Sequence, residues 1–164
     1  MHLPGFNFHK PSTIVEALDL LEKNAGATLM AGGTDLLVEI KKGLRAPDNI
    51  VSLSEIKALK AIEEDDKNIY IGAGLTHDDV IASPLIRKHI PGLVNALSKI
   101  GSAQVRNSAT IGGNICTAAS CSDSAPILMA LNASVEVMAS GSTRIVALKD
   151  FFVFNKKTTL TNKL

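Results

Sequence analysis

Two double-glycine segments contain the residues whose types and spacing are best suited to hold an anion. One is Ala31-Gly32-Gly33-Thr34-Asp35 and the other is Thr110-Ile111-Gly112-Gly113-Asn114. Glycine has no Cβ atom, so the main chain can turn tightly there and direct successive N–H groups at a bound anion. Two such turns, in a chain without a basic cluster, predict a pyrophosphate held between two loops.

Each segment also has a simpler interpretation. The first is typical of a tight strand-to-helix turn capped by a hydroxyl, and the run 104–114 is compatible with a polar loop between helices. Thr110 and Asn114 flank the second pair of glycines, however, and hydrogen bonds to a charged group contribute roughly 1.5–3 kcal/mol each. A neutral cradle of amides and hydroxyls can therefore bind a phosphate without a lysine. Asp123 is open to two interpretations, a helix cap and an acceptor for a sugar-like polyol.

Other kinds of chemistry fit the sequence poorly. Gly72-Ala73-Gly74 lacks the third glycine of a dinucleotide fingerprint, and no Gly-Lys-Ser/Thr occurs. Cys116 and Cys121 are the only cysteines, too few for a metal cluster or a disulfide scaffold. We expect His77 and His89 to be surface or capping residues, and Arg106 either to pin the second glycine segment or to face a partner. With no side-chain catalytic constellation, any redox chemistry belongs to a cofactor.

An α+β arrangement must position these turns. Thr13 and Glu16 are spaced as a capping box, and the glycines of the first turn separate a short apolar strand from a helix. The N-terminal order is βαβαβ, and the most suitable boundary lies at 54–58. Beyond it, two hairpins enclose a helical region, and the last residues, 156–164, carry no structural signal. The predicted segments are helices near 13–23, 35–43, 83–90, 93–100 and 125–131, and strands near 28–31, 49–53, 59–64, 69–73, 135–137 and 145–148.

Composition restricts the class of protein. The 164 residues include 46% hydrophobic and 20% charged side chains, so the chain can bury a core. The formal net charge of +1 and the scattered Lys and Arg residues argue against nucleic-acid binding. No apolar run is long enough for a membrane span, and the N-terminus lacks the apolar segment of a signal peptide. We therefore expect a cytoplasmic protein that contacts neither membrane nor nucleic acid.

The motifs, taken in order, resemble those of the FAD-binding (medium) subunit of molybdenum hydroxylases. This family includes xanthine, carbon monoxide and nicotinate dehydrogenases. The resemblance covers nearly the whole chain. Its motifs are Ala31-Gly32-Gly33-Thr34-Asp35-Leu36-Leu37, Ile71-Gly72-Ala73-Gly74-Leu75-Thr76, Gln104-Val105-Arg106-Asn107 with Thr110-Ile111-Gly112-Gly113-Asn114, and Ser122-Asp123 before Pro126.

The resemblance implies a two-subdomain FAD-binding fold of the vanillyl-alcohol-oxidase (PCMH) type, with subdomains 1–56 and 57–164. Both glycine segments would contact the pyrophosphate, Asp123 would hold the ribityl chain with Thr117 nearby, and Ile100 would cover the isoalloxazine where some relatives have an aromatic residue. The implied FAD-binding residues are Leu29, Met30, Ala31, Gly32, Gly33, Thr34, Asp35, Leu36, Ile100, Thr110, Ile111, Gly112, Gly113, Asn114, Thr117 and Asp123.

The implied function is electron transfer within an oxidoreductase complex. Electrons would pass from a molybdopterin-containing large subunit, through a [2Fe–2S] small subunit, to FAD and then to NAD or another acceptor. Family members continue into a C-terminal domain past the position of Lys157-Thr158, whereas this chain ends at Leu164. An alternative is a non-catalytic scaffold of the same complex that has lost FAD binding. A stand-alone flavin reductase of the cell-wall-precursor type is a weaker fit, since that class needs a following substrate domain.

Overall fold

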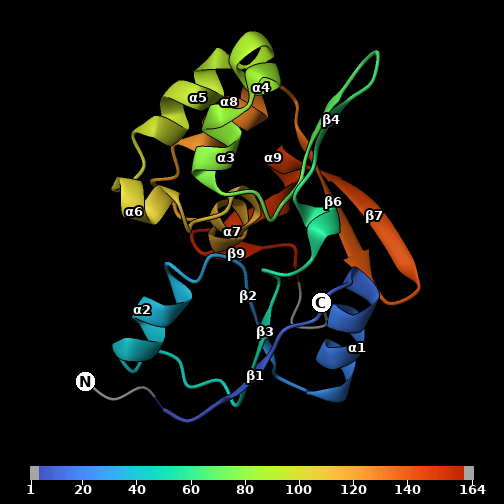
Figure 1. Ribbon diagram of the computed structural model, residues 1–164, viewed down its shortest axis with the longest axis vertical. Helices are drawn as coiled ribbons and strands as arrows, with labels where there is room; N and C mark the ends of the chain where they lie inside the picture. The colour runs from blue at the N-terminus through green and yellow to red at the C-terminus, as the bar shows by residue number, and fades with distance from the viewer. Residues whose placement is uncertain (1–3, 161–164) are drawn as a thin grey trace.

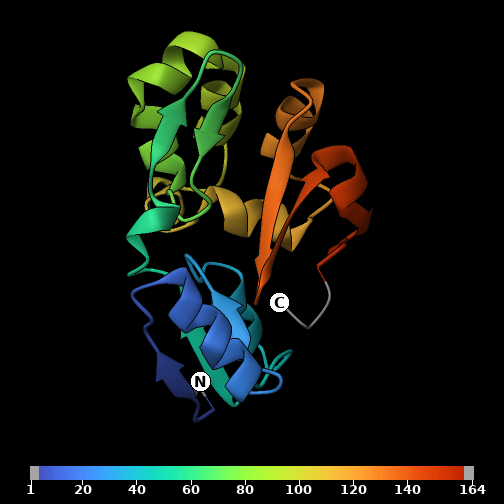
Figure 2. The ribbon, with the colours of Figure 1, turned by 90° about the vertical axis from the view of Figure 1, so that its right-hand side faces the viewer.

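The computed structural model describes residues 4–160. Its N-terminal part is a three-stranded parallel sheet in the order β1-β3-β2, with two helices as connections (Figures 1 and 2). The central strand is buried at Ile50, Val51 and Ser52, because the sheet and its helices cover it. These elements are β1 (Asn7–His9), α1 (Ile14–Lys23), β2 (Thr28–Met30), α2 (Leu36–Lys41) and β3 (Asn49–Ser52).

The first helix begins where the sequence predicts. Thr13 Oγ1 accepts a 3.1 Å hydrogen bond from the Glu16 N–H. The Glu16 carboxylate reaches one residue further back than the capping box requires and accepts a 2.8 Å bond from the Ser12 N–H. On the inner face, Ala17 packs in a cluster with Val51 and Ile56, which fixes the helix against the sheet.

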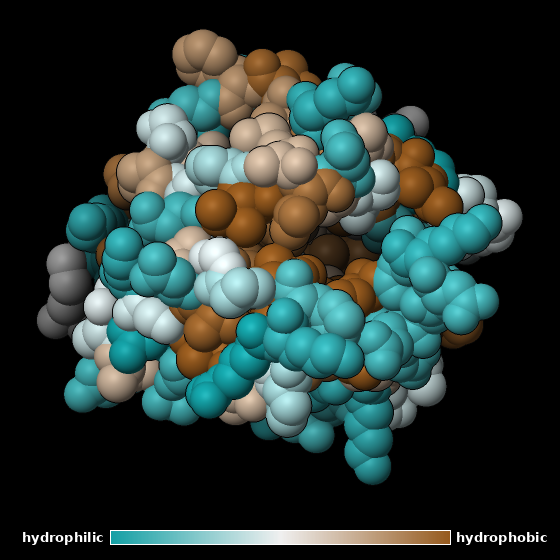
Figure 3. Space-filling view, turned by 90° about the horizontal axis from the view of Figure 1, so that it is seen from above, coloured by the Kyte–Doolittle hydropathy of each residue, from teal (hydrophilic) through white to brown (hydrophobic). Residues whose placement is uncertain are grey.

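The middle of the chain is a hairpin followed by six short helices. Leu75, Val80, Ile86, Leu93 and Leu97 form its core. Viewed from above, apolar side chains gather in a hollow on this end of the molecule, with hydrophilic side chains around them (Figure 3). The elements are η1 (Lys57–Leu59), β4 (Ile62–Glu64), β5 (Ile69–Ile71), α3 (His77–Ala82), α4 (Pro84–His89), α5 (Pro91–Ser98), α6 (Ala103–Arg106), α7 (Ile111–Thr117) and α8 (Ser124–Ala130).

The C-terminal part adds two antiparallel hairpins around a short helix. Phe151, fully buried, packs with Leu148 and Val137, and with Ile115 from α7. This cluster joins the hairpins to the helical part, and the hairpins are the orange and red segments of Figure 2. The elements are β6 (Ser134–Ala139), β7 (Ser142–Ala147), α9 (Leu148–Phe151), β8 (Phe152–Phe154) and β9 (Lys157–Thr158).

Three expectations from the sequence are wrong. The run 104–114 is not a continuous polar loop, because α6 and the start of α7 occupy most of it. The segment after 156 is structured as far as residue 160, since β9 pairs with β8; residues 161–164 lie outside the described part. His77 is not a surface residue, because its relative exposure is 0%, and it is not the cap of α3, because Thr76 is. Hydrophobic periodicity does not predict α6 or β9, because a helix of four residues and a strand of two are too short to repeat a pattern.

Candidate flavin site

The two double-glycine segments lie side by side in the structure. A Cβ atom built on Gly32 would stand 1.9 Å from the main-chain oxygen of Ser108 and 2.9 Å from the Cα of Ala109. One built on Gly113 would stand 3.9 Å from the Cβ of Ala31. In both ribbon views the end of β2 accordingly approaches α7 (Figures 1 and 2). The sequence places these segments about eighty residues apart, and the fold brings them into contact.

The first glycine segment presents a row of free donors. Within residues 4–160, the main-chain N–H groups of Gly32, Gly33, Thr34, Asp35 and Leu36 donate to no protein acceptor. Gly33 has φ +72°, which reverses the chain after β2, and helical bonding starts only with the Leu37 N–H to the Gly33 oxygen at 3.0 Å. Gly32, Gly33 and Thr34 are partly exposed, so these amides can reach a ligand. Consecutive unpaired N–H groups of this kind fit an anionic group such as a phosphate.

The second glycine segment differs, because its amides are already paired. The N–H groups of Ile111 and Gly112 donate to the oxygens of Leu75 and Ala73, each at 3.0 Å. Gly113 N–H donates to Thr110 Oγ1 at 3.1 Å, and Asn114 N–H to the Thr110 oxygen at 2.9 Å. The expectation that these amides grip a pyrophosphate is therefore wrong, because the segment is the capped first turn of α7 rather than a loop.

The glycines of this second segment allow close packing. A Cβ atom on Gly112 would lie 2.7 Å from both the Cβ and the main-chain oxygen of Ala73. The start of α7 is thus held against the extended residues before α3, and Thr76 and Thr110 form an isolated antiparallel bridge there. Glycine is required at 112 because no side chain fits between the two main chains.

Side chains, not amides, supply the polar groups of the second segment. Asn114 Oδ1 accepts hydrogen bonds from Ser124 Oγ at 2.6 Å and from Ser122 Oγ at 2.9 Å. With its oxygen so engaged, the Asn114 side chain is fixed with its Nδ2 group as a donor, and this group has no acceptor in the described part of the chain. Asp123 lies between the two serines, and Ser122 and Ser124 therefore link it to α7. Sequence reasoning did not point to Ser124, since only the fold brings it to Asn114.

Asp123 occupies the N-cap position of α8 but makes no capping hydrogen bond, and the residue is exposed. Its carboxylate is therefore accessible. Thr117, at the end of α7, donates from Oγ1 to Asp35 Oδ2 at 3.2 Å. The resemblance implies that both residues lie near FAD, and the structure joins Thr117 directly to the first glycine segment.

Ile100 follows the end of α5 by two residues and lies half-buried against the helical core. Its main-chain oxygen accepts a 3.2 Å bond from Arg106 Nη1, and Arg106 Nε also pairs with Asp78 Oδ1 at 3.3 Å. Of the two roles considered for Arg106, the structure supports pinning. Its guanidinium ties α6 to α3 next to the second glycine segment.

Of the two residues at the end of β2, Leu29 is 39% exposed and Met30 is half-buried.

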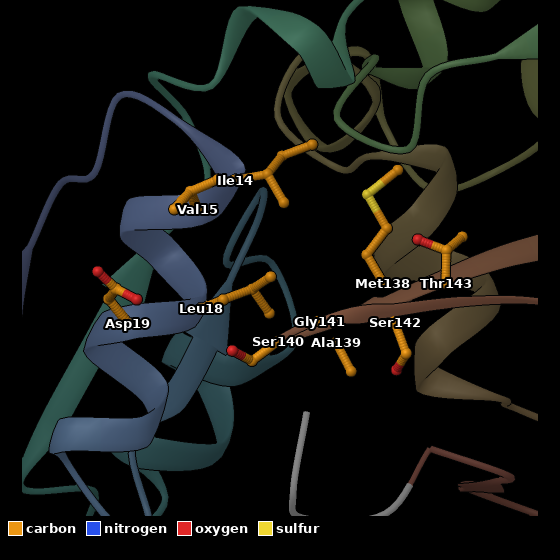
Figure 4. Close-up of a pocket in the computed structure, with 10 residues that line it drawn as sticks. All are labelled: Ile14, Val15, Leu18, Asp19, Met138, Ala139, Ser140, Gly141, Ser142 and Thr143. Carbon is orange, nitrogen blue, oxygen red and sulfur yellow. The ribbon is translucent and has the colours of Figure 1, made fainter.

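A groove lies away from both glycine segments. It has a volume of about 390 Å³ and lies between α1 and the tip of the β6–β7 hairpin. Ile14, Leu18 and Met138 give it an apolar wall, and Asp19 is the one charged residue that lines it (Figure 4). Because it contains no residue of either glycine segment, we do not assign the flavin to it.

Within residues 4–160, no three His, Cys, Asp or Glu side chains form a group that could hold a metal ion. Cys116 and Cys121 are free thiols. Among the helices described, none has both the length and the apolar character needed to cross a bilayer. The polar groups gathered at the glycine segments are thus the main chemical feature of this part of the chain.

Comparison with known families supports the assignment of a flavin site to the glycine segments. Residues 4–163 match the family described as the FAD binding domain in molybdopterin dehydrogenase. The chain belongs to this family. Its cofactor is accordingly FAD. The unpaired amides of the first glycine segment are compatible with the phosphates of that cofactor.

Individual relatives agree with the family. The chain is 37% identical over 152 residues to the nicotinate dehydrogenase FAD-subunit of Eubacterium barkeri, covering 92% of this chain and 51% of that protein. The structure superposes on carbon monoxide dehydrogenase from Hydrogenophaga pseudoflava with a TM-score of 0.96 at 31% identity, covering 99% of this chain and 57% of that one. Quinoline 2-oxidoreductase from Pseudomonas putida 86 gives a TM-score of 0.96 at 26% identity, covering 99% of this chain and 57% of that one. These neighbours confirm the predicted FAD-binding α+β fold, and this chain spans about half the length of such relatives.

Proposed function

We propose that this chain is the FAD-binding part of an electron-transfer subunit in a molybdenum hydroxylase. It would receive electrons from iron–sulfur clusters and pass them, through FAD, to NAD or another acceptor. The observation that supports this proposal is the row of five unpaired N–H groups from Gly32 to Leu36, packed against α7 in a chain of this family. The two free cysteines fit a reducing, cytoplasmic setting.

Different residues would bind different parts of FAD. The amides of 32–36 would hold the pyrophosphate, and Asn114 Nδ2 would donate to the same region of the cofactor. The exposed carboxylate of Asp123 would accept hydrogen bonds from the ribityl hydroxyls, and Ile100 would cover the ring. When bound, FAD supplies the two-electron redox chemistry, and the chain supplies orientation and shielding from water.

The remaining assignments extend this proposal. The subdomains would be residues 1–56 and 57–164, with η1 as the connection between them. The partners would be a molybdopterin-containing large subunit and a [2Fe–2S] small subunit, as the resemblance implies. A scaffold without flavin is the alternative, and the experiment below separates the two.

The test is titration of the purified chain with FAD, with riboflavin as the comparison ligand. If the amides hold phosphates, riboflavin should bind at least about tenfold more weakly, because hydrogen bonds to a charged group contribute roughly 1.5–3 kcal/mol each. Gly113→Val should weaken FAD binding, because its side chain would enter the space between Gly113 and Ala31 of the first glycine segment, whereas Gly5→Val, in open space, should change nothing.

Calorimetry that detects no binding to the folded chain at about millimolar FAD would overturn the proposal. Capture of the large or small subunit by that flavin-free chain would then support the scaffold instead.

A further inference from the structure

A buried histidine is hydrogen-bonded through its main chain to Ala109, the residue just before the second glycine segment. His77, the first residue of α3, has a relative exposure of 0%. Neither ring nitrogen reaches a hydrogen-bond partner in the part of the chain that the structure describes. A buried polar group without a partner is destabilising, and native proteins keep few of them. The position of this ring therefore calls for an explanation.

His77 is part of a short main-chain ladder that holds the second glycine segment. Its N–H donates to the oxygen of Ala109 at 2.9 Å, next to the bonds from Ile111 to Leu75 and from Gly112 to Ala73. The Gly32 Cα packs on the neighbouring Ser108–Ala109 peptide. Ala109, the residue bonded to His77, therefore lies directly beside the first glycine segment.

The surroundings of the ring favour its neutral form. Burial is the main cause that lowers the pKa of His77 below 6.5. The Thr110 main chain lies close enough to the ring to oppose this shift, although not in hydrogen-bonding geometry, and the Asp78 carboxylate also opposes it, whereas Arg106 of α6 reinforces it. On α3, Asp79 is engaged with the Thr76 N–H at 2.9 Å, and on α4 Arg87 is bonded to the Ile81 oxygen at 2.7 Å. Helix α5 and the ladder residues 109–112 carry no titratable side chain.

We propose that the ladder holding the glycine segments depends on burial of the neutral His77 ring, and that protonation of this ring opens the ladder and releases FAD at acidic pH. This inference rests on the proposed flavin site. The unfolded chain binds a proton at His77 more readily than the folded chain does. Stability and FAD affinity are therefore complete above the ordinary pKa of 6.5 and are lost as the pH falls below it.

The test compares His77→Phe, whose ring cannot take a proton, with wild type and with His89→Gln, which removes an exposed histidine on α4. FAD dissociation constants are measured from about pH 7.5 to about pH 5. We expect a rise of about tenfold for wild type and His89→Gln, and little change for His77→Phe. A purely structural role would weaken His77→Phe equally at every pH. An equal pH dependence in His77→Phe and wild type would overturn the inference.

Amide hydrogen exchange on the flavin-free wild-type chain keeps the inference testable if His77→Phe does not fold, or if FAD does not bind. The Ile111 and Gly112 amides should lose protection, corrected for intrinsic rates, as the pH falls below 6.5. Unchanged protection at about pH 5 would overturn the ladder mechanism. Absence of FAD binding at neutral pH would instead count against the flavin site.

Discussion

Thr117 Oγ1 donates a 3.2 Å hydrogen bond to Asp35 Oδ2, although 82 positions separate the two residues. The bond joins the end of α7 to the start of α2, and therefore links the two glycine segments by their side chains. An ion pair also joins α2 to the turn between β8 and β9, since Lys156 Nζ lies 3.3 Å from Glu39 Oε1. The relative position of the two segments thus depends on exposed or half-buried polar contacts as well as on close main-chain packing.

Removal of the Asp35–Thr117 bond should weaken FAD binding more than folding. Asp35 is exposed, so we expect a coupling free energy of about 0.5–1 kcal/mol in a double-mutant cycle of Asp35→Ala and Thr117→Val. Urea unfolding and FAD titration of the four chains measure it. Thr143→Val, at an exposed threonine of β7, controls for the change of residue type. Strictly additive effects on both quantities would show that the bond contributes nothing.

Gly32→Ala should force the two segments apart. The new Cβ atom would stand 1.9 Å from the Ser108 oxygen, a main-chain atom that cannot rotate away. We expect a loss of about 1–3 kcal/mol in unfolding free energy, together with weaker FAD binding.

Gly92→Ala is the matched control for Gly32→Ala. Its nearest neighbour is an Ile127 carbon at 3.8 Å, and Gly92 lies within helix α5. Alanine there should be neutral or stabilise the chain by up to about 1 kcal/mol. If both variants behaved alike in thermal unfolding, the contact between Gly32 and Ser108 would be refuted.

The neighbours Gly112 and Gly113 should respond differently to alanine. A Cβ atom on Gly112 meets the main-chain oxygen of Ala73 at 2.7 Å, whereas one on Gly113 meets the Thr110 hydroxyl at 2.8 Å. The hydroxyl can rotate, at the cost of a helix cap worth about 1 kcal/mol. We therefore expect Gly112→Ala to lower the melting temperature more than Gly113→Ala. The reverse order would contradict the packing described for the start of α7.

Tyr70 reports on the β4–β5 hairpin. Its hydroxyl donates to Asp65 Oδ2 at 2.8 Å, and this hydrogen bond is the main cause that raises the Tyr70 pKa above 10.0. Because the protonated phenol is the form that donates, the bond is present below that pH and is lost as the pH rises through the folded pKa. The chain has one tyrosine and no tryptophan, so tyrosinate absorbance follows this group alone.

Asp65→Asn should move the absorbance midpoint back toward 10.0, whereas Asp66→Asn, at the adjacent carboxylate, should leave it in place. An identical midpoint in wild type and Asp65→Asn would exclude the bond in solution.

Local sequence was sufficient for elements that contain their own start and stop signals. The cap at Thr13, the reversal at Gly33 and the hairpin turn at 65–68 depend on side chains within four residues, so the pattern predicts them directly. It also identified both glycine segments as special. It could not show their different roles, because the residue types of a segment do not reveal whether its main-chain amides find a distant acceptor.

The sequence by itself determined the α+β class, the order of the N-terminal elements, the family and the two glycine pairs. Only the tertiary structure decided that the amides of 32–36 are free while those of 111–114 are paired. It also decided that Ser108 touches Gly32, that Thr117 reaches Asp35, and that His77 is buried. The physical reason is how far apart along the chain the interacting groups lie. Turns and caps depend on bonds between near neighbours, whereas burial and the pairing of an amide depend on which distant main chain the fold brings beside it.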